Sequence, residues 1–424
     1  MGSAVLSNRE EKSLLVIGGG IAGVTAALEA AEAGASVILI ERSPFLGGRA
    51  IALHLYFPKL CPPECGFEIN FRRLKNNPRI TVLTQAELES LRGKPGDFQA
   101  TVRIDPRYVN DRCTLCGDCL QVCPAERADD FNFGLTRTKA IHPPQPMAFP
   151  AAFVVDRAAC PEGCTACVAA CRYGAIDLGQ AAERRTFPVA AVIAATGWEP
   201  YDASRLVHLG YGKLPNVVTN VMLERMAATE GPTAGKIVRP SDGNAPKTVA
   251  FVQCAGSRDE NHLPYCSSVC CLASLKHTTY IHALYPEAEV TIFYIDIRTP
   301  GLLEDFRTKV ATNNHLKLVK GRVGKIEEDP ETHNLLVTVE DALAGKKLTE
   351  AFDLVVLATG IVPRSGGLPA EFPRDEFGFL TNGTPGFYAA GCAKRPEEVA
   401  ATVRDATGAA LKALQYAMRS ARHE

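Results

Sequence analysis

The 424-residue chain contains little tryptophan, little methionine and no excess of charge of either sign. It has one Trp and five Met, and 46 Lys and Arg residues are balanced by 47 Asp and Glu residues. A chain so close to neutral lacks the basic surplus that favours nucleic acid, so we expect no nucleic-acid partner. No uncharged apolar run approaches the roughly 18 residues that span a bilayer, so we expect no direct membrane span.

The first twelve residues are polar and charged, and no apolar core with a small-residue cleavage site follows them. This pattern argues against a secretory signal peptide, and it predicts a cytoplasmic chain. Any association with a membrane would then come through a partner.

Cysteine is the exception in an otherwise ordinary globular composition, with 15 Cys in the chain. The chain is too long for a small disulfide scaffold, and a cytoplasmic compartment keeps thiols reduced. The cysteines are therefore interpreted first as metal ligands. Length alone predicts about three domains' worth of sequence.

A dinucleotide-binding turn opens the chain. The short apolar strand 14–17 leads into Gly18-x-Gly20-x-x-Gly23 and a helical run, and the next strand ends at Glu41. Glycines at this spacing let the backbone approach a pyrophosphate, and the acidic residue is placed to accept hydrogen bonds from ribose hydroxyls.

The segments that follow favour FAD over NAD. The Gly-Gly-Arg turn after Glu41 and two Ala-Thr-Gly turns, each ending an apolar strand, resemble those of two-dinucleotide-binding flavoproteins. A helix is expected from Pro396 to about Ser420, with its N-terminus directed at the flavin. That family usually has Gly-Asp where this chain has Gly391-Cys392. The expected cofactor-binding residues are Gly18, Gly20, Ile21, Ala22, Gly23, Glu41, Arg42, Gly47, Gly48, Arg49, Ala195, Thr196, Gly197, Ala358, Thr359, Gly360, Gly391, Cys392 and Val399.

Two four-cysteine runs lie between Pro106 and Ile176. The first, Cys113-x2-Cys116-x2-Cys119-x3-Cys123-Pro, has the spacing of a bacterial ferredoxin, whose fourth Cys ligates the other cluster. The second run has one extra residue in its first gap and lacks the final Pro. Ferredoxin logic predicts one [4Fe–4S] cluster on Cys113, Cys116, Cys119 and Cys171, and another on Cys160, Cys164, Cys167 and Cys123. Two structural zinc ions are the alternative.

A third group of four thiols follows a later strand. Cys254, Cys266, Cys270 and Cys271 are expected to converge at a strand end and a helix start. Neighbouring cysteines pair poorly as disulfides, so a shared cluster is favoured over two disulfides, and buried free thiols are the alternative. The segment after Cys254 also lacks the second glycine motif that an NAD(P)H site would need.

These residues identify a resemblance. Cys254-x11-Cys266-x3-Cys270-Cys271, with Ala-Gly-Ser-Arg after the first Cys, resembles the signature of the A subunit of heterodisulfide reductase. In that family the four positions bind an unusual [4Fe–4S] cluster near FAD. The segments around Cys61-Pro-Pro-Glu-Cys65, Asn76-Asn-Pro-Arg and Tyr294-Ile-Asp-Ile-Arg more specifically resemble the A subunit of quinone-interacting membrane-bound oxidoreductase complexes.

The resemblance implies an α/β, thioredoxin-reductase-like flavoprotein with a ferredoxin-like insert. The expected ranges are an FAD-binding part at 1–105, the insert at 106–180, a continuation of the FAD domain and connector at 181–245, a second nucleotide-binding-like domain with the third cysteine group at 246–345, and a second FAD-binding part at 346–424. It further implies a peripheral subunit that reaches the inner membrane through its partners. One partner would carry a second flavin and further iron–sulfur clusters, and the other would be a membrane haem b subunit that binds quinone. Electrons would pass between menaquinol and adenylylsulfate (APS) reductase, in dissimilatory sulfur metabolism.

Three alternatives stay open. The chain could be an electron-bifurcating heterodisulfide-reductase-type subunit, an NAD(P)H-dependent disulfide reductase that uses Cys61 and Cys65, or an assembly subunit with structural metals. The Cys61-x3-Cys65 pair differs from Cys-x-x-Cys, and a structural or subunit-contact role is favoured for it. Cys392 is expected to pack at the flavin, and no catalytic base is assigned.

Overall fold

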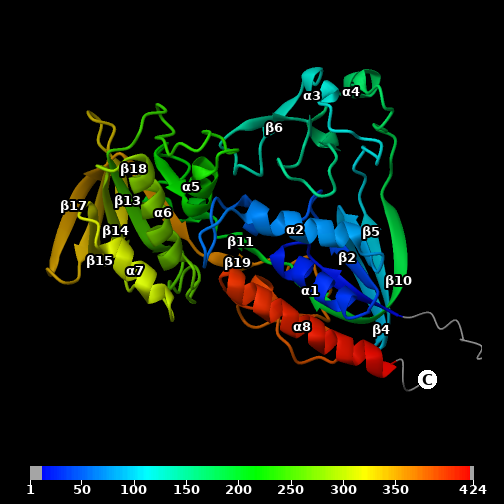
Figure 1. The fold of residues 1–424 in the computed structure, drawn as a ribbon. Helices are drawn as coiled ribbons and strands as arrows, with labels where there is room; N and C mark the ends of the chain where they lie inside the picture. Colours follow the sequence, from blue (N-terminus) through cyan, green and yellow to red (C-terminus); the bar gives the residue numbers. More distant parts are fainter. Residues whose placement is uncertain (1–11, 421–424) are drawn as a thin grey trace, which may run out of the picture.

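The structure, a computed structural model, describes residues 12–420 and divides them into three parts (Figure 1). The first domain comprises 12–105, 181–200 and 364–420, the insert 106–180, and the second domain 201–363. The segment 1–11, to which the expectation of no signal peptide applies, lies outside the described residues. Among the residues that are described, no helix has the length and apolarity needed to cross a bilayer.

The first domain is built on a seven-stranded sheet of order β3-β2-β1-β10-β5-β4, with β20 also paired to β10. Strand β1 lies in its parallel part and is buried along almost its whole length, as expected for a strand covered on both faces. The strands are β1 (Ser13–Ile17), β2 (Val37–Glu41), β3 (Ile80–Thr84), β4 (Ala86–Lys94), β5 (Asp97–Ile104), β10 (Glu183–Ala194) and β20 (Phe387–Ala389).

Three helices of the first domain, α1 (Ile21–Glu32), α2 (Pro63–Asn76) and α8 (Val399–Ser420), lie together on one side of this sheet (Figure 1). Helices α1 and α8 pack directly on each other through alanines such as Ala27 and Ala410, which are fully buried in one core cluster. Small side chains let the two backbones approach closely, so α8 is held beside the glycine turn that begins α1.

The insert stands at one end of the first domain and carries little regular structure (Figure 1). Its short helices α3 and α4 pack against each other, and three of its cysteines are part of one small core cluster, with three more packed against it. Its elements are α3 (Asp118–Gln121), α4 (Ala166–Ala170), β6 (Glu126–Ala128), β7 (Arg137–Lys139), β8 (Ile141–His142) and β9 (Val154–Val155).

The second domain has its own seven-stranded sheet, of order β12-β18-β13-β14-β15-β16-β17, whose first five strands pair in parallel. Helix α6 packs on β13 and β18, beside α5 and α7. Its elements are β12 (Val217–Thr219), α5 (Asn220–Ala227), β13 (Thr248–Ala255), α6 (Cys270–Leu284), β14 (Glu289–Tyr294), α7 (Leu303–Ala311), β15 (Leu316–Glu328), β16 (Leu335–Asp341), β17 (Lys346–Phe352) and β18 (Leu354–Thr359).

A two-stranded antiparallel ribbon joins the two domains. Strand β11 (Trp198–Pro200) carries the chain out of the first domain, and β19 (Ile361–Pro363) carries it back. The remaining elements are single 3₁₀ turns: η1 (Ala50–Ala52), η2 (Arg157–Ala159), η3 (Ala203–Arg205), η4 (Val207–Leu209) and η5 (Gly391–Ala393).

Sheet membership corrects two of the expected domain ranges. The connector 181–245 was assigned to the FAD domain, but β12 and α5 within it belong to the second domain. The range 346–424 was likewise assigned to the FAD domain, but β17 and β18 complete the second sheet. Local apolar runs reveal a strand, but the choice of sheet depends on pairing between residues that are distant in the sequence.

Candidate functional site

The glycine turn between β1 and α1 requires its glycines. Gly18 has φ +104°, and a Cβ there would lie 2.3 Å from the carbonyl oxygen of Ala195. A Cβ at Gly23 would lie 1.7 Å from the carbonyl oxygen of Gly18, and one at Gly48 would lie 2.8 Å from the Cα of Gly20. Two glycine turns and the end of β10 therefore meet backbone against backbone.

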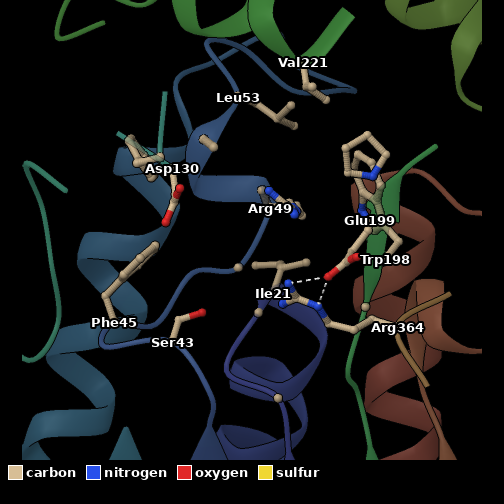
Figure 2. A pocket seen from close by; sticks show the side chains of 18 of the residues that line it. Ile21, Ser43, Phe45, Arg49, Leu53, Asp130, Trp198, Glu199, Val221 and Arg364 are labelled. Carbon is tan, nitrogen blue, oxygen red and sulfur yellow. Dashed lines mark hydrogen bonds and ion pairs between the residues drawn. The ribbon is translucent and has the colours of Figure 1, made fainter. Parts of the chain in front are cut away.

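These turns border a cavity of about 1090 Å³ that all three parts of the chain line (Figure 2). Its volume is at the upper end of the range for small-molecule and cofactor sites. Most of the expected cofactor residues line it: Gly18, Gly20, Ile21, Ala22, Glu41, Arg42, Gly48, Arg49, Ala195, Thr196, Gly197, Cys392 and Val399. Gly23, Gly47 and Gly391 do not line it, and they pack behind these residues instead.

The second Ala-Thr-Gly turn, Ala358-Thr359-Gly360, was expected at the cofactor and is absent from the lining. It ends β18 of the second sheet, where the Thr359 hydroxyl donates to Asn220 Oδ1 at 2.8 Å. A Cβ at Gly360 would lie 2.4 Å from the Ser257 hydroxyl oxygen. The tripeptide is the same as the first one, but its strand belongs to the other domain.

Glu41 ties two turns together on the cavity wall. Its Oε2 accepts a hydrogen bond from the Gly19 amide at 2.5 Å, and its Oε1 accepts one from the Ser43 amide at 2.7 Å. The carboxylate is buried at the end of β2. Its predicted contact with a ribose remains a prediction, made from a side chain that the two amides already hold in place.

Arg42, Arg49 and Arg364 lie near the Glu199 carboxylate on the same wall, and Figure 2 shows Arg49, Arg364 and Glu199 there. Arg364 Nε donates to Glu199 Oε1 at 2.6 Å, and Arg42 Nη2 lies 3.5 Å from the same oxygen. Burial, together with repulsion from Arg364 and Arg42, lowers the pKa of Arg49. Burial raises the pKa of Glu199, but its arginine neighbours hold it below the usual value. The surplus of positive charge beside a glycine turn suits a pyrophosphate.

Unpaired polar atoms show that the cavity fits a polar cofactor. Buried polar groups are normally hydrogen-bonded, so orphaned atoms around a cavity point to a missing partner. Within the described chain, six buried side-chain atoms without a hydrogen-bond partner belong to lining residues: Gln85 Oε1, His142 Nδ1, Arg157 Nη1, Thr196 Oγ1, His277 Nδ1 and Glu397 Oε2. Together with the glycine turn and the arginines, they fit a dinucleotide such as FAD.

The start of α8 differs from the prediction. The helix was expected to begin at Pro396, but it begins at Val399. The Glu398 carboxylate caps it, accepting from the amides of Ala400 at 2.6 Å and Ala401 at 2.7 Å. Because the Glu398 carboxylate accepts hydrogen bonds from these two amides, they are not free to bind the flavin.

Sequence reasoning missed the cavity walls that the insert and the second domain supply. Trp198 lines it from the ribbon, Arg157 from the insert and Lys276 from α6. No local motif marks these residues, because tertiary packing alone brings them to the cavity. The one available signal was the only Trp of the chain, which directly follows the first Ala-Thr-Gly turn.

The insert brings its cysteines together in the crossed arrangement expected of a ferredoxin. Burial, and then the neighbouring thiols of Cys113, Cys116 and Cys171, raise the pKa of Cys119 to about 11. Cys171 from the second run therefore lies with three members of the first run.

The other set shows the reverse crossing. Cys123 lines a small cavity together with Cys160, Cys164 and Cys167. Burial raises the pKa of Cys160, and Arg157, which hydrogen-bonds this thiol, lowers it. The first run thus supplies one residue to the second set, as its spacing predicts.

The third group lies where β13 ends and α6 begins. Cys270 hydrogen-bonds both Cys254 and Cys271, and this lowers the pKa of each of those two thiols. Cys266 lies near Arg298, which also interacts with Cys271. Cys254 has φ +56°, a left-handed conformation that is uncommon outside glycine and typical of functional sites.

Among residues 12–420, no three His, Cys, Asp or Glu side chains are grouped closely enough to hold a single metal ion.

The remaining cysteines lie apart from these sets. Cys61 hydrogen-bonds Tyr56, with Cys65 nearby, and burial and both thiols raise the pKa of that tyrosine. Cys392 is buried, and its thiol donates to the carbonyl oxygen of Glu397 at 3.3 Å. Neither Cys61 nor Cys65 lines the large cavity, although Tyr56 does.

Comparisons with known proteins agree with this geometry. Residues 13–58 match the FAD dependent oxidoreductase family. The thioredoxin reductase of T. acidophilum has the same fold, with a TM-score of 0.53 and 16% identity over 97% of this chain and 100% of that one. The Lactococcus lactis enzyme aligns at a TM-score of 0.52 and 12% identity, over 96% and 99%. The chain thus has a thioredoxin-reductase-like fold whose first segment resembles FAD dependent oxidoreductases, and the fold class predicted from the sequence is confirmed.

Curated relatives narrow the class. The A subunit of the H(2):CoB-CoM heterodisulfide,ferredoxin reductase of Methanothermobacter thermautotrophicus is 37% identical over 416 residues, 94% of this chain and 63% of that protein. The iron-sulfur A subunit of the CoB--CoM heterodisulfide reductase of Methanocaldococcus jannaschii is 38% identical over 420 residues, again 94% and 63%. The chain is thus similar over most of its length to the A subunits of heterodisulfide reductases, and it spans about 63% of the length of these relatives.

Proposed function

We propose that the chain is the FAD and iron–sulfur electron-transfer subunit of a membrane-associated complex. One observation carries the proposal: the cavity and the third cysteine group share the first turns of α6. Val269, Leu272 and Lys276 line the cavity, while Cys270 and Cys271 hold the thiol group beside Cys254. A flavin in the cavity and a cluster on these cysteines would be separated by a single helical turn.

FAD, when bound, exchanges electrons in pairs or singly, and it can therefore connect two-electron partners to one-electron clusters. The chain's own residues would hold the cofactors at short range. The glycine turn and Arg42, Arg49 and Arg364 would anchor the pyrophosphate, and Glu41 would orient the ribose. Cys116, which is exposed on the insert, would place one cluster within reach of a partner.

We assign three [4Fe–4S] clusters to the chain. The thiol sets described above supply the ligands: Cys113, Cys116, Cys119 and Cys171; Cys123, Cys160, Cys164 and Cys167; Cys254, Cys266, Cys270 and Cys271. The ferredoxin spacing and the crossed proximity of the insert cysteines support the first two, and the hydrogen-bonded thiols at α6 support the third.

The finer proposal concerns the partners. The sequence around Cys61 and Cys65, Asn76-Asn-Pro-Arg and Tyr294-Ile-Asp-Ile-Arg supports the A subunit of a quinone-interacting membrane-bound oxidoreductase complex. Its partners would be APS reductase, a second flavin and iron–sulfur subunit, and a haem b subunit in the membrane. Electrons would pass between menaquinol and APS reductase, and the chain would lie on the cytoplasmic side of the membrane.

A second candidate is a bifurcating heterodisulfide-reductase-type subunit. The name of the M. thermautotrophicus relative, which joins heterodisulfide and ferredoxin, supports it. A third candidate function, NAD(P)H-dependent disulfide reduction at Cys61 and Cys65, has less support, because neither thiol lines the cavity.

Measured FAD and iron content tests the proposal that the chain binds FAD and three [4Fe–4S] clusters. The chain purified without oxygen should hold one FAD and about 12 iron atoms, four for each cluster. Cys270→Ala should remove about four iron atoms and one electron paramagnetic resonance signal. Cys392→Ala is the control and should keep all of the iron. Unchanged iron and spectrum in Cys270→Ala would refute the ligand assignment.

The function itself is tested on the complex solubilised from membranes. Menaquinol should reduce its flavin and clusters, and APS reductase supplied with APS should reoxidise them. Reoxidation by a heterodisulfide and ferredoxin, with no response to APS reductase, would decide for the second candidate. Rapid bleaching of the flavin by NADPH would instead support an NAD(P)H-dependent disulfide reductase.

A further inference from the structure

The segment between the two cysteine runs, residues 124–159, forms part of the wall of the cofactor cavity. We call it the bridging segment. Asp130, His142 and Arg157 are among its lining residues, and Figure 2 shows the Asp130 side chain near Phe45 and Arg49 of the first domain. An iron–sulfur insert that served only to carry electrons would have no need to enclose the flavin cavity.

The bridging segment packs on the residues that follow Glu41. Arg107 connects the two, because its Nη1 donates to the carbonyl oxygen of Pro44 at 2.7 Å and its Nη2 to that of Ala152 at 2.8 Å. The rings of Phe45 and Phe131 meet edge to face at 5.9 Å. Under the proposed function Glu41 faces the ribose, so this is the adenosine end of the cavity.

Three residues that line the cavity each carry a buried side-chain atom without a hydrogen-bond partner. His142 Nδ1 and Arg157 Nη1 come from the bridging segment, and Gln85 Oε1 comes from the first domain. The backbone amide of Gln85 donates to the carbonyl oxygen of Ser43 at 3.2 Å, which places this residue beside the segment that follows Glu41. Each of these atoms is buried without a partner. Adenine presents an amino donor and ring-nitrogen acceptors, which an amide oxygen and a guanidinium can satisfy.

The same segment begins and ends at one cysteine set. Cys123 directly precedes it and Cys160 directly follows it, and both line the small cavity of that set. Arg157 faces both sites, because it hydrogen-bonds the Cys160 thiol and leaves Nη1 free at the large cavity. Whatever holds Cys123 and Cys160 together therefore also closes the two ends of the wall.

We propose that the bridging segment is part of the flavin site, that His142 and Arg157 recognise the adenosine half of the cofactor, and that loading of the Cys123, Cys160, Cys164 and Cys167 set strengthens FAD binding. The inference rests on the proposed function for the identity of the cofactors. Because linkage is reciprocal, bound FAD also raises the affinity of this set for its cluster by the same factor.

Affinity measurements on the full, cluster-loaded chain test the recognition. After FAD is removed, FAD and ADP are titrated while the fluorescence of Trp198 is followed. His142→Ala and Arg157→Gln should each weaken both ligands about tenfold, the effect of one lost hydrogen bond to a buried group. His282→Ala is the control, since it loses hydrogen bonds outside the cavity. Affinities within twofold of the unaltered chain in both variants would overturn the recognition.

A pair of cysteine variants tests the coupling. Cys160→Ser and Cys116→Ser should each lose about four iron atoms, but only Cys160→Ser should weaken FAD by about tenfold or more and speed hydrogen exchange across 124–159. Equal FAD affinity in the two variants would overturn the coupling. Failure of the proposed function has a different signature, in which the unaltered chain binds no FAD or holds no iron.

Discussion

Glu224 and Lys276 form an ion pair that is almost completely buried between α5 and α6. Lys276 Nζ lies 2.7 Å from Glu224 Oε1, and the two side chains are 4% and 3% exposed. The pair also connects the domains, because Glu224 Oε2 accepts from the His54 amide at 2.9 Å and Lys276 donates to the carbonyl oxygen of Leu55 at 2.5 Å. Both residues line the large cavity.

Removing one partner of this pair should be costly. Lys276→Met leaves a buried carboxylate without its cation, and we expect a loss of about 3–5 kcal/mol in the free energy of unfolding. The double variant Glu224→Gln/Lys276→Met should recover part of that loss. Guanidinium denaturation at pH 7 measures it. Lys317→Met, which breaks the exposed pair with Glu350, is the control and should cost less than about 1 kcal/mol. An equal cost for the two lysines would contradict the prediction.

Acid should weaken the fold through His277. Burial lowers the pKa of this fully buried imidazole, although Glu224 acts in the opposite direction. The unfolded chain gains the proton below about pH 6.5, whereas the folded chain stays neutral to lower pH. The free energy of unfolding should therefore fall, by up to about 1.4 kcal/mol per pH unit, as the pH drops below 6.5.

His277→Gln keeps a donor for Glu224 and removes the titration. Its denaturation midpoint should change less between pH 7.5 and pH 5.5 than that of the unaltered chain. An identical change would show that His277 is not the responsible group, and the half-buried His54 and His142, whose pKa values are also lowered, would be tested next.

The glycine turn should tolerate no side chain. Gly18→Ala places a Cβ against the Ala195 carbonyl at a left-handed φ, a strain of about 1–3 kcal/mol. We expect the Kd for FAD to rise more than about tenfold. The matched control is Gly408→Ala, an exposed position within α8 that has nothing within 4 Å, and it should stabilise the helix by up to about 1 kcal/mol. Normal FAD binding by Gly18→Ala would refute the role of the turn.

Glu398 should stabilise α8 as its cap. Glu398→Ala removes both carboxylate contacts to the first turn, and we expect a loss of about 1 kcal/mol. Thermal unfolding followed by circular dichroism measures it, with the exposed Glu371→Ala as control. A melting temperature equal to that of the control would mean that other groups cap the helix.

The sequence predicted the parts of the site that depend on spacing. The turn from Gly18 to Gly23 and the ferredoxin run from Cys113 to Cys123 are local patterns whose backbone geometry follows from their residues. The position of Cys171 beside the thiols of the first run agrees with the spacing, which predicts that each run contributes one cysteine to the other set.

The parts that depend on tertiary pairing could not be predicted. Ala358-Thr359-Gly360 looks identical to the first Ala-Thr-Gly turn, but β18 pairs within the other sheet. Likewise, nothing near Arg157 or Lys276 indicates that they reach a cavity whose glycine turn lies far away in the sequence.

The paired ribbon of β11 and β19 has a consequence for how the protein handles electrons. Two paired antiparallel strands and the buried contact of Glu224 and Lys276 to residues 54–55 fix the orientation of the two domains, whereas a single linker would let them rotate. The gap between the flavin cavity and the thiols of α6 is then a constant of the fold. Under the proposed function, the difference in reduction potential between the flavin and the cluster at α6, and not domain motion, would govern electron transfer between them. Electron transfer would then continue in a frozen sample, in which large movements stop.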